Sequence, residues 1–352
     1  MPHPSRPLPG LTRRRLLGLA GAGTGAVLLG GCGDDIGTGA APTGTPSIAG
    51  DLSSLPDLSG RRIRVSTFPQ NHAAAPLYWP QFAPNGLEVE VRTVPSGTDM
   101  NVALEQGELD FALFGLVNGF VQSAEGIGSR VVAMGAEEGA SLVVAADSSY
   151  ETVEDLAGRR IGFKGPAFQY LLLLELLEGA GLDPSADVQL VPVEWNDMPV
   201  ALARGDVEAY MGTEPNPSRS VADGTGRRLE GIYETPAGRL NSAIWASRRI
   251  VEEEPDLIPV AVALQRAAAE QLSPGGENDP DVWRDLTVDQ FGYDPAVYEA
   301  LLPNVGAVWR FDDTWLPQAQ GQGRRMASLG LIPEEPDYDA VIQPVVDPPS
   351  LT

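Results

Sequence analysis

Short apolar runs separated by amphipathic stretches make up the chain from Arg61 onward. Apolar runs of about four to eight residues are typical of buried strands, and longer runs with a helical repeat are typical of helices. The alternation therefore predicts an α/β protein whose sheets are mostly parallel and flanked by helices. In the first half, the predicted strands are 63–68, 87–94, 109–114, 130–134 and 141–145, and the predicted helices are 99–106 and 119–125.

A second strand and helix cycle follows, with strands at 160–163, 188–193, 209–211 and 228–232 and helices at 152–156, 167–180 and 198–204. A strand at 241–247 and a long helix at 255–272 indicate a return to the first lobe. Two lobes are therefore expected, one of residues 61–144 plus 242–340 and one of residues 145–241. The acidic, Pro-rich end is expected to be irregular, and we assign 341–352 to an irregular tail.

The first 59 residues lack this alternation and are typical of an export signal followed by a linker. Arginines at 13–15 precede an apolar stretch from Gly18 to Gly31 that is shorter than the run of about 20 residues that a membrane-spanning helix needs. Thr-Arg-Arg-Arg-Leu-Leu resembles the twin-arginine export signal, and Leu-Gly-Gly-Cys resembles the lipobox of bacterial lipoproteins. We predict a signal peptide at 1–32, lipidation of Cys32 and a flexible Gly/Pro/Ser/Thr-rich tether at 33–59. The alternative is that Cys32 is an ordinary unpaired cysteine.

Composition excludes several classes of function. The chain carries 48 acidic and 24 basic residues, a formal charge of -24, which opposes binding to nucleic acid. Cys32 is the only cysteine, so the chain cannot form an internal disulfide. His3 and His72 are the only histidines, and His3 lies in the predicted signal, so a multi-histidine zinc site is excluded from the exported part. We expect no metal, no cofactor and a monomer.

Several phrases resemble the nitrate/sulfonate/taurine-type solute-binding family. They are Glu-Thr-Val-Glu-Asp-Leu-Ala-Gly-Arg-Arg-Ile-Gly-Phe-Lys-Gly-Pro-Ala-Phe at 151–168, Leu-Glu-Gly-Ala-Gly-Leu-Asp-Pro at 177–184, Ala-Leu-Ala-Arg-Gly-Asp-Val-Glu-Ala-Tyr at 201–210 and Ala-Leu-Glu-Gln-Gly-Glu-Leu-Asp-Phe-Ala at 103–112. The resemblance covers residues 61–250. It implies a type II periplasmic-binding-protein fold, with a small-molecule ligand held between two lobes that are joined by two crossing strands, which we place at 143–147 and 241–246.

The same resemblance implies partners and a location. The protein would deliver its solute to the permease and ATPase subunits of an ABC transporter, from the outer face of the cytoplasmic membrane, where Cys32 would anchor it. The superfamily also contains a pyrimidine-forming enzyme branch marked by a Cys-rich motif, which this chain lacks because Cys32 is its only cysteine.

Ligands in open α/β sheets bind at the loops that follow strands, where helix N-termini offer free N–H groups to anions. In the first lobe the candidate ligand-binding residues are Phe68, Gln70, Asn71, His72, Ser96, Gly97, Thr98, Gly115 and Asn118. In the second lobe they are Lys164, Gly165, Phe168, Trp195, Asn196, Asp197, Thr213 and Glu214. The alternative for Ser96, Thr98 and Asn118 is that they only cap helices, and Phe168 and Trp195 could equally belong to the core.

Lys164 and Glu214 carry the ligand hypothesis. Lys164 is the only lysine in the chain, which fits a compact ammonium at a binding loop, although a solvated strand end is the alternative. A carboxylate of Glu214 aimed at the ligand would favour taurine-like or amine-bearing solutes over nitrate. If Glu214 instead pairs with Lys164 or an arginine, it is structural and does not indicate the ligand.

Two other functions compete with solute binding. A hydrolase or transferase is disfavoured because the chain has no Gly-x-Ser-x-Gly, no P-loop and no cysteine within the predicted lobes. A lipoprotein that only senses or docks is not separated from an importer component by the sequence.

Overall fold

The first sheet is built from both ends of the folded chain. The computed structural model describes residues 58–69, 72–84, 86–343 and 349. The predicted signal at 1–32 and the tether at 33–59, except for its last two residues, lie outside the described residues.

The first sheet has the order β11-β4-β10-β3-β1-β2. Its strands are β1 (Arg62–Thr67), β2 (Glu88–Thr93), β3 (Phe111–Gly115), β4 (Arg130–Glu138), β10 (Leu240–Ala246) and β11 (Val305–Ala307).

The second sheet comes from one continuous segment and has the order β7-β6-β8-β5-β9. Its strands are β5 (Ala140–Ala145), β6 (Arg160–Phe163), β7 (Gln189–Pro192), β8 (Ala209–Thr213) and β9 (Gly226–Arg228). The two-sheet α/β architecture predicted from the sequence is confirmed, but the strands are not mostly parallel. Only β1 with β2 and β3, and β6 with β7 and β8, run parallel among the described strands. The first strand after each passage between the sheets, β5 or β10, runs antiparallel to its neighbours.

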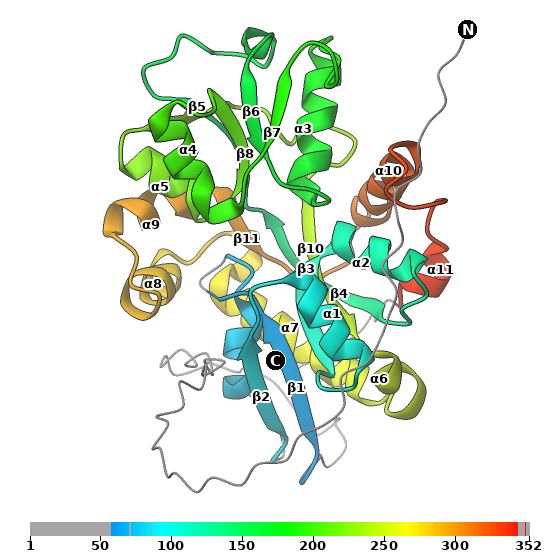
Figure 1. The fold of residues 1–352 in the computed structure, drawn as a ribbon. Helices are drawn as coiled ribbons and strands as arrows, with labels where there is room; N and C mark the ends of the chain where they lie inside the picture. Colours follow the sequence, from blue (N-terminus) through cyan, green and yellow to red (C-terminus); the bar gives the residue numbers. More distant parts are fainter. Residues whose placement is uncertain (1–57, 70–71, 85, 344–348, 350–352) are drawn as a thin grey trace, which may run out of the picture. The chain divides into compact units, whose positions relative to one another are not determined.

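Helices cover both faces of each sheet (Figure 1). The α-helices are α1 (Gly97–Glu105), α2 (Leu116–Ala124), α3 (Phe168–Gly179), α4 (Met198–Arg204), α5 (Asn216–Ala222), α6 (Arg248–Glu253), α7 (Leu257–Leu272), α8 (Pro280–Arg284), α9 (Pro295–Leu301), α10 (Trp315–Ser328) and α11 (Tyr338–Val341). Short 3-10 turns are at Ala75–Phe82, Glu154–Leu156, Trp195–Asp197, Pro274–Gly276 and Leu302–Asn304, and a π-helical turn is at Asp285–Gln290.

Alternation along β3 shows how one strand serves two cores. Phe111 and Leu113 are fully buried in a cluster that includes the apolar face of α7. Ala112 and Phe114, which point to the opposite face, are buried in a second cluster with side chains of α1 and α2. That second cluster also contains Leu142 and Ile161 of the other sheet, so one hydrophobic core is shared by both sheets.

The chain first passes between the sheets at Glu138 and Gly139, not at 143–147 as predicted. The whole of β5, from Ala140 onward, pairs with β8 in the second sheet. Glu138 and Gly139 both have positive φ values, 58° and 73°, which turn the chain sharply. A Cβ at position 139 would lie 2.2 Å from Nε2 of His72, so only glycine fits there. The lobe boundary therefore falls before β5.

The return passage lies between β9 and β10 and is held beside the first one. The backbone N–H of Glu138 donates to the carbonyl of Arg239 at 2.9 Å, and Leu240 is in register with Glu137 of β4. The predicted crossing strand at 241–246 belongs entirely to β10 of the first sheet. The segment that changes sheets is therefore 229–239.

The C-terminal third, whose role the sequence left open, joins the two sheets. Strand β11 adds to β4 in the first sheet, while α9 lies against α5 of the second. Helix α10 contacts both α2 and α3, and its Gln322 donates to the carbonyls of Ala237 and Leu240 at 3.2 and 2.7 Å. The predicted irregular tail at 341–352 starts with ordered residues, because Val341 is the last residue of α11 and Ile342 forms a bridge with Val131. The C-terminal elements thus brace the passages.

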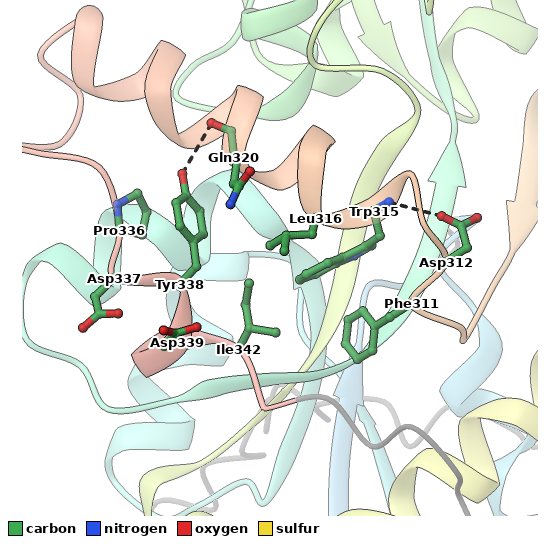
Figure 2. Close-up of a pocket in the computed structure, with 10 residues that line it drawn as sticks. All are labelled: Phe311, Asp312, Trp315, Leu316, Gln320, Pro336, Asp337, Tyr338, Asp339 and Ile342. Carbon is green, nitrogen blue, oxygen red and sulfur yellow. Dashed lines mark hydrogen bonds between the residues drawn. The ribbon is translucent and has the colours of Figure 1, made fainter.

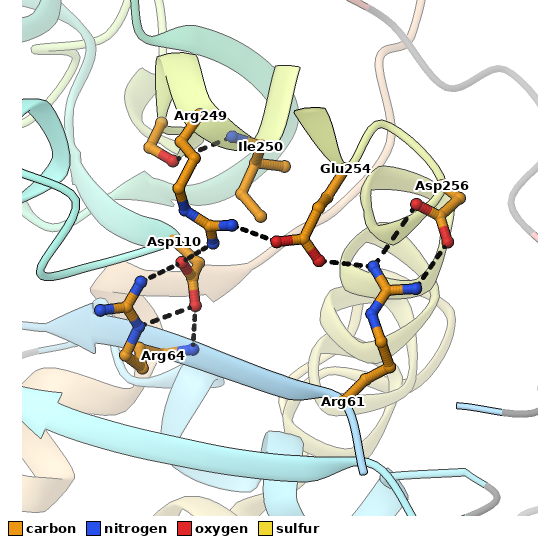
Figure 3. A network of polar contacts seen from close by, with 8 residues as sticks. Arg61, Arg64, Asp110, Arg249, Ile250, Glu254 and Asp256 are labelled. Atoms are coloured by element: carbon orange, nitrogen blue, oxygen red, sulfur yellow. Dashed lines mark hydrogen bonds and ion pairs between the residues drawn. The ribbon is translucent and has the colours of Figure 1, made fainter. Parts of the chain in front are cut away.

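A network of charges fixes the far end of the first sheet (Figure 3). The carboxylate of Asp110 is 1% exposed and accepts hydrogen bonds from the guanidinium of Arg64 at 2.7 and 3.1 Å. Arg249 also binds Asp110 and bridges to Glu254, which in turn binds Arg61 at 2.6 Å. Because Asp110 directly precedes β3, this network joins the start of β3 to β1 and α6. The candidate loops lie at the opposite, carboxyl end of β3.

Candidate functional site

The first predicted loop group lies at the beginning of α1. Ser96 is the N-cap of α1, and its hydroxyl accepts from the backbone N–H of Asp99 at 3.3 Å. Gly97 lies beside the end of β3, because a Cβ there would be 3.4 Å from Cβ of Phe114. Thr98 is exposed. Ser96 therefore has the capping role that the sequence offered as the alternative.

Helices α2 and α3 both begin without a side-chain cap among the described residues. The N-cap of α2 is Gly115 at the end of β3, and the N-cap of α3 is Ala167, after the loop that follows β6. Asn118, in the first turn of α2, donates from Nδ2 to the carbonyl of Pro166 at 3.3 Å. The N-terminus of α2, which follows a strand of the first sheet, therefore lies next to the N-terminus of α3, which follows a strand of the second sheet. Gly165 is exposed beside them.

Lys164 lies on the same loop and is paired with a carboxylate. Its ammonium contacts Glu194, and the two side chains are 37% and 70% exposed. Trp195 is half-buried against the apolar core around α4, and Asn196 and Asp197 are exposed. The loops after β6 and β7 are thus brought together, as the sequence predicted for neighbouring strand ends. Phe168 is 2% exposed and belongs to the core.

Glu214 does not lie among those loops. Its side chain is fully buried at the end of β8, where it accepts from Nη2 of Arg228 at 2.8 Å and from Nδ2 of Asn304 at 2.9 Å. The hydroxyl of Ser218 donates to the same carboxylate at 2.7 Å. Of the alternatives that the sequence left open, the structure has the arginine pair and not a pair with Lys164. The carboxylate joins the second sheet to the C-terminal segment.

His72 lies beside the passage between the sheets and is 5% exposed. Its Nε2 is 3.4 Å from Nδ2 of Asn241, which donates to the carbonyl of Glu138 at 2.6 Å. Burial lowers the pKa of His72 to about 4, and a hydrogen bond with the backbone of Glu214 opposes this only partly. The ring is therefore neutral at physiological pH and packs against Gly139 as part of the passage.

The structure brings part of the predicted set together. Gly115, Asn118, Lys164 and Gly165 belong to the two segments that the Asn118–Pro166 contact joins, and the Lys164–Glu194 pair links them to the loop of Trp195, Asn196 and Asp197. Ser96, Gly97 and Thr98 begin α1 beside the end of β3. At the passage are His72 and Glu214, with Thr213 half-buried in β8 and paired with Ala140 of β5. Phe68 is half-buried between the two main cores, and Gln70 and Asn71 lie outside the described residues.

A pocket of about 540 Å³ lies elsewhere, at the C-terminal elements, and sequence reasoning missed it. Its lining residues come from α10 and the segment before it, and from α11 and the residues on either side of it, and none of them belongs to the predicted loops (Figure 2). They are Phe311, Asp312, Trp315, Leu316, Gln320, Pro336, Asp337, Tyr338, Asp339 and Ile342. The sequence signal was limited to aromatic and acidic residues at 311–315 and 337–339, which are too far apart in the chain to indicate one site.

Two searches of the described residues found nothing. No three His, Cys, Asp or Glu side chains there come together in a way that could hold a metal ion. None of the helices in the described part of the chain is both long enough and apolar enough to span a membrane.

Comparison with known proteins places the chain in a family. The model of the family described as NMT1/THI5 like matches residues 80–272, more than half of the chain. The chain belongs to the NMT1/THI5-like family. This NMT1/THI5-like protein also shares its fold with the periplasmic aliphatic sulphonate binding protein SsuA from Escherichia coli, at a TM-score of 0.69 and 20% identity over 82% of this chain and 94% of that one. The family resemblance and the two-lobed periplasmic-binding-protein fold predicted from the sequence are confirmed.

Two curated relatives of this NMT1/THI5-like protein match over a shorter stretch. A putative thiamine biosynthesis protein from Haemophilus influenzae is 32% identical over 137 residues, and a putative aliphatic sulfonates-binding protein from Escherichia coli is 30% identical over 141 residues. These stretches are 38% and 39% of this chain, and each spans 43% of the relative's length. The desulfurization enzyme DSZB has the same fold at a TM-score of 0.62 and 19% identity, over 81% of this chain and 96% of that one.

Proposed function

We propose that this protein is the solute-binding component of an ABC importer, which holds a small anionic organic solute of the sulfonate type where α2 and α3 begin. The proposed partners are the permease and ATPase subunits of that importer. The fold shared with SsuA and the family membership support the general function. The chemistry of the loops supports the proposed class of ligand.

The observation that carries the proposal is the meeting of two uncapped helix N-termini. The first N–H groups of a helix have no partner within the helix and carry a partial positive charge, so they favour an anion. Helices α2 and α3 present such groups from different sheets, and the Asn118–Pro166 hydrogen bond holds them adjacent. Lys164 adds a positive charge on the same loop. The burial of Glu214 removes the carboxylate that would have repelled an anion.

Lys164→Met is expected to weaken sulfonate binding at least about tenfold, about 1.4 kcal/mol, because it removes the positive charge of the site. Glu194→Gln is the matched variant: it keeps Lys164 and removes the competing carboxylate, so affinity is expected to stay equal or become tighter. Titration calorimetry with alkanesulfonates and taurine measures both. Unchanged affinity in Lys164→Met would remove this lysine from the site.

Pyrimidine-type ligands are the second candidate, favoured by the relative that is named a putative thiamine biosynthesis protein, because thiamine contains a pyrimidine ring. A thermal-shift screen of sulfonates, taurine, nitrate and pyrimidines separates these candidates, because a ligand at a hundredfold excess over Kd stabilises the folded state by about 2.7 kcal/mol. Stabilisation by pyrimidines alone would replace the sulfonate proposal. Recovery of the bound solute unchanged after incubation would support binding without catalysis, and a converted product would favour an enzyme.

We further propose that the protein is exported and held at the membrane by a lipid on Cys32. The support is the sequence of the first 32 residues and the periplasmic proteins that share the fold. Cys32→Ser is expected to move the protein from the membrane fraction to the soluble fraction, since it removes the thiol that would carry the lipid. Fractionation followed by mass determination of the N-terminus measures this. Membrane retention of the variant would contradict the anchor.

A further inference from the structure

The C-terminal pocket, defined by the ten lining residues given above, combines an aromatic wall with acidic groups. The rings of Phe311 and Trp315 meet edge to face, with centroids 4.4 Å apart at 73°. The ring of Tyr338 forms another side of the pocket and packs edge to face against Phe120 of α2, with the ring centroids 6.0 Å apart. Leu316 is 42% exposed, while Trp315 is 4% exposed. The lining therefore combines aromatic rings with the partly exposed side chain of Leu316 (Figure 2).

The charges of the lining are all negative. Asp312, Asp337 and Asp339 line the pocket, and no lysine or arginine does. Asp312 and Asp337 are partly engaged, since Oδ1 of Asp312 accepts from the N–H groups of Thr314 and Trp315 at 2.8 and 3.1 Å, and Oδ1 of Asp337 accepts from Ala340 at 3.2 Å. In Figure 2 these two lie at opposite ends of the lining, with Asp339 between Tyr338 and Ile342.

Asp339 is the lining carboxylate that makes no polar contact with the described residues. It makes no hydrogen bond or ion pair with any described residue, and it is exposed. Two arginines act on α11 from outside the lining: Arg130 donates to the carbonyl of Ala340, and the charge of Arg324 acts on the hydroxyl of Tyr338. Burial, followed by the charge of Glu335, raises the pKa of Tyr338 to about 12, so its ring remains a neutral phenol.

We propose that the C-terminal pocket binds a small organic cation, an ammonium or quaternary ammonium group on an apolar body. Aromatic rings attract a cation through their negative faces, and the carboxylate of Asp339 adds an attraction that a neutral or anionic ligand would not have. The volume of about 540 Å³ suits a molecule of the size that such pockets hold. This site shares no residue with the proposed anion site, so it would take a second ligand of opposite charge.

The test uses three probes of similar shape: benzyltrimethylammonium, benzyl alcohol and phenylacetate, titrated into the full chain by calorimetry. Saturable one-to-one binding of the ammonium, with at least about tenfold weaker binding of the alcohol and the anion, is expected. Equal binding of the alcohol would show an apolar site without cation preference and would overturn the proposal. Absence of saturable ammonium binding would do the same.

Variants locate the binding. Asp339→Asn is expected to weaken the ammonium about fivefold, as for a partly exposed charge pair. Asp313→Asn is the matched control, because Asp313 is a neighbouring exposed aspartate that does not line the pocket, and it should leave affinity unchanged. Leu316→Trp fills the pocket from its exposed side and should abolish binding. Ammonium binding that survives both Asp339→Asn and Leu316→Trp would place it elsewhere. Sulfonate binding in Leu316→Trp is expected to be unchanged, so failure at one site is distinguishable from failure at the other.

Discussion

Replacing Glu214 with alanine is expected to lower the free energy of unfolding by about 3 kcal/mol, because it leaves the largely buried guanidinium of Arg228 without its counter-charge. The side chains of Glu214 and Arg228 are 0% and 21% exposed, so water restores little of the lost interaction. Asn304 and Ser218 also lose their acceptor. Urea unfolding of the variant and the wild type measures the difference.

Glu194→Ala is the matched control for this prediction. It also removes a glutamate from an ion pair, but the Glu194 side chain is 70% exposed and its partner Lys164 is 37% exposed. The expected loss is at most about 1 kcal/mol. Equal losses in Glu214→Ala and Glu194→Ala would mean that the buried carboxylate does not stabilise the junction of the two sheets.

Acidification below about pH 6.5 is expected to remove about 3 kcal/mol of stability through His72 alone. Its folded-state pKa is about 4, below the ordinary value of 6.5, so the unfolded chain takes up a proton at a pH where the folded chain does not. This contribution is complete above about pH 6.5 and is lost as pH falls toward about 4. Below that value both states are protonated and the loss stops growing.

His72→Gln separates this effect from the titration of carboxylates, which is common to both proteins. The introduced amide can still contact Asn241 but does not titrate. The stability of the variant should therefore fall less than that of the wild type between about pH 7 and about pH 5. Urea unfolding across this range gives the comparison. Parallel stability curves for the two proteins would contradict a depressed pKa for His72.

The pattern of apolar and polar residues predicted most of the helices and strands from β1 to α7. The helix expected at 198–204 is α4, and the strand expected at 188–193 is β7, because the spacing of apolar residues between turn signals is visible in the sequence itself. Strand β4 extends four residues past its predicted end at Met134, since its continuation pairs with Leu240 and Val305, which lie far along the chain. The passage was misplaced because β5 is as apolar as β4, and only pairing assigns it to a sheet.

The candidate site was predictable as far as it depends on strand ends. Gly115 and Lys164 follow strands that are visible in the sequence, and the structure brings their loops together. The role of Glu214 was not predictable, because its partners Arg228 and Asn304 are 14 and 90 residues away. The C-terminal pocket was not predictable for the same reason, because Phe311 and Tyr338 are far apart in the sequence and become neighbours only in the folded chain.

The unit that folds is longer than the segment that the family model matches. The family match ends at residue 272, yet the core that both sheets share includes Trp315, Ala319 and Met326 of α10, and β11 closes the edge of the first sheet. A fragment cut at the family boundary would expose the apolar surface of α2 and α3 to solvent. The joining of the two sheets therefore depends on the C-terminal third as well as on the segment that the family model matches.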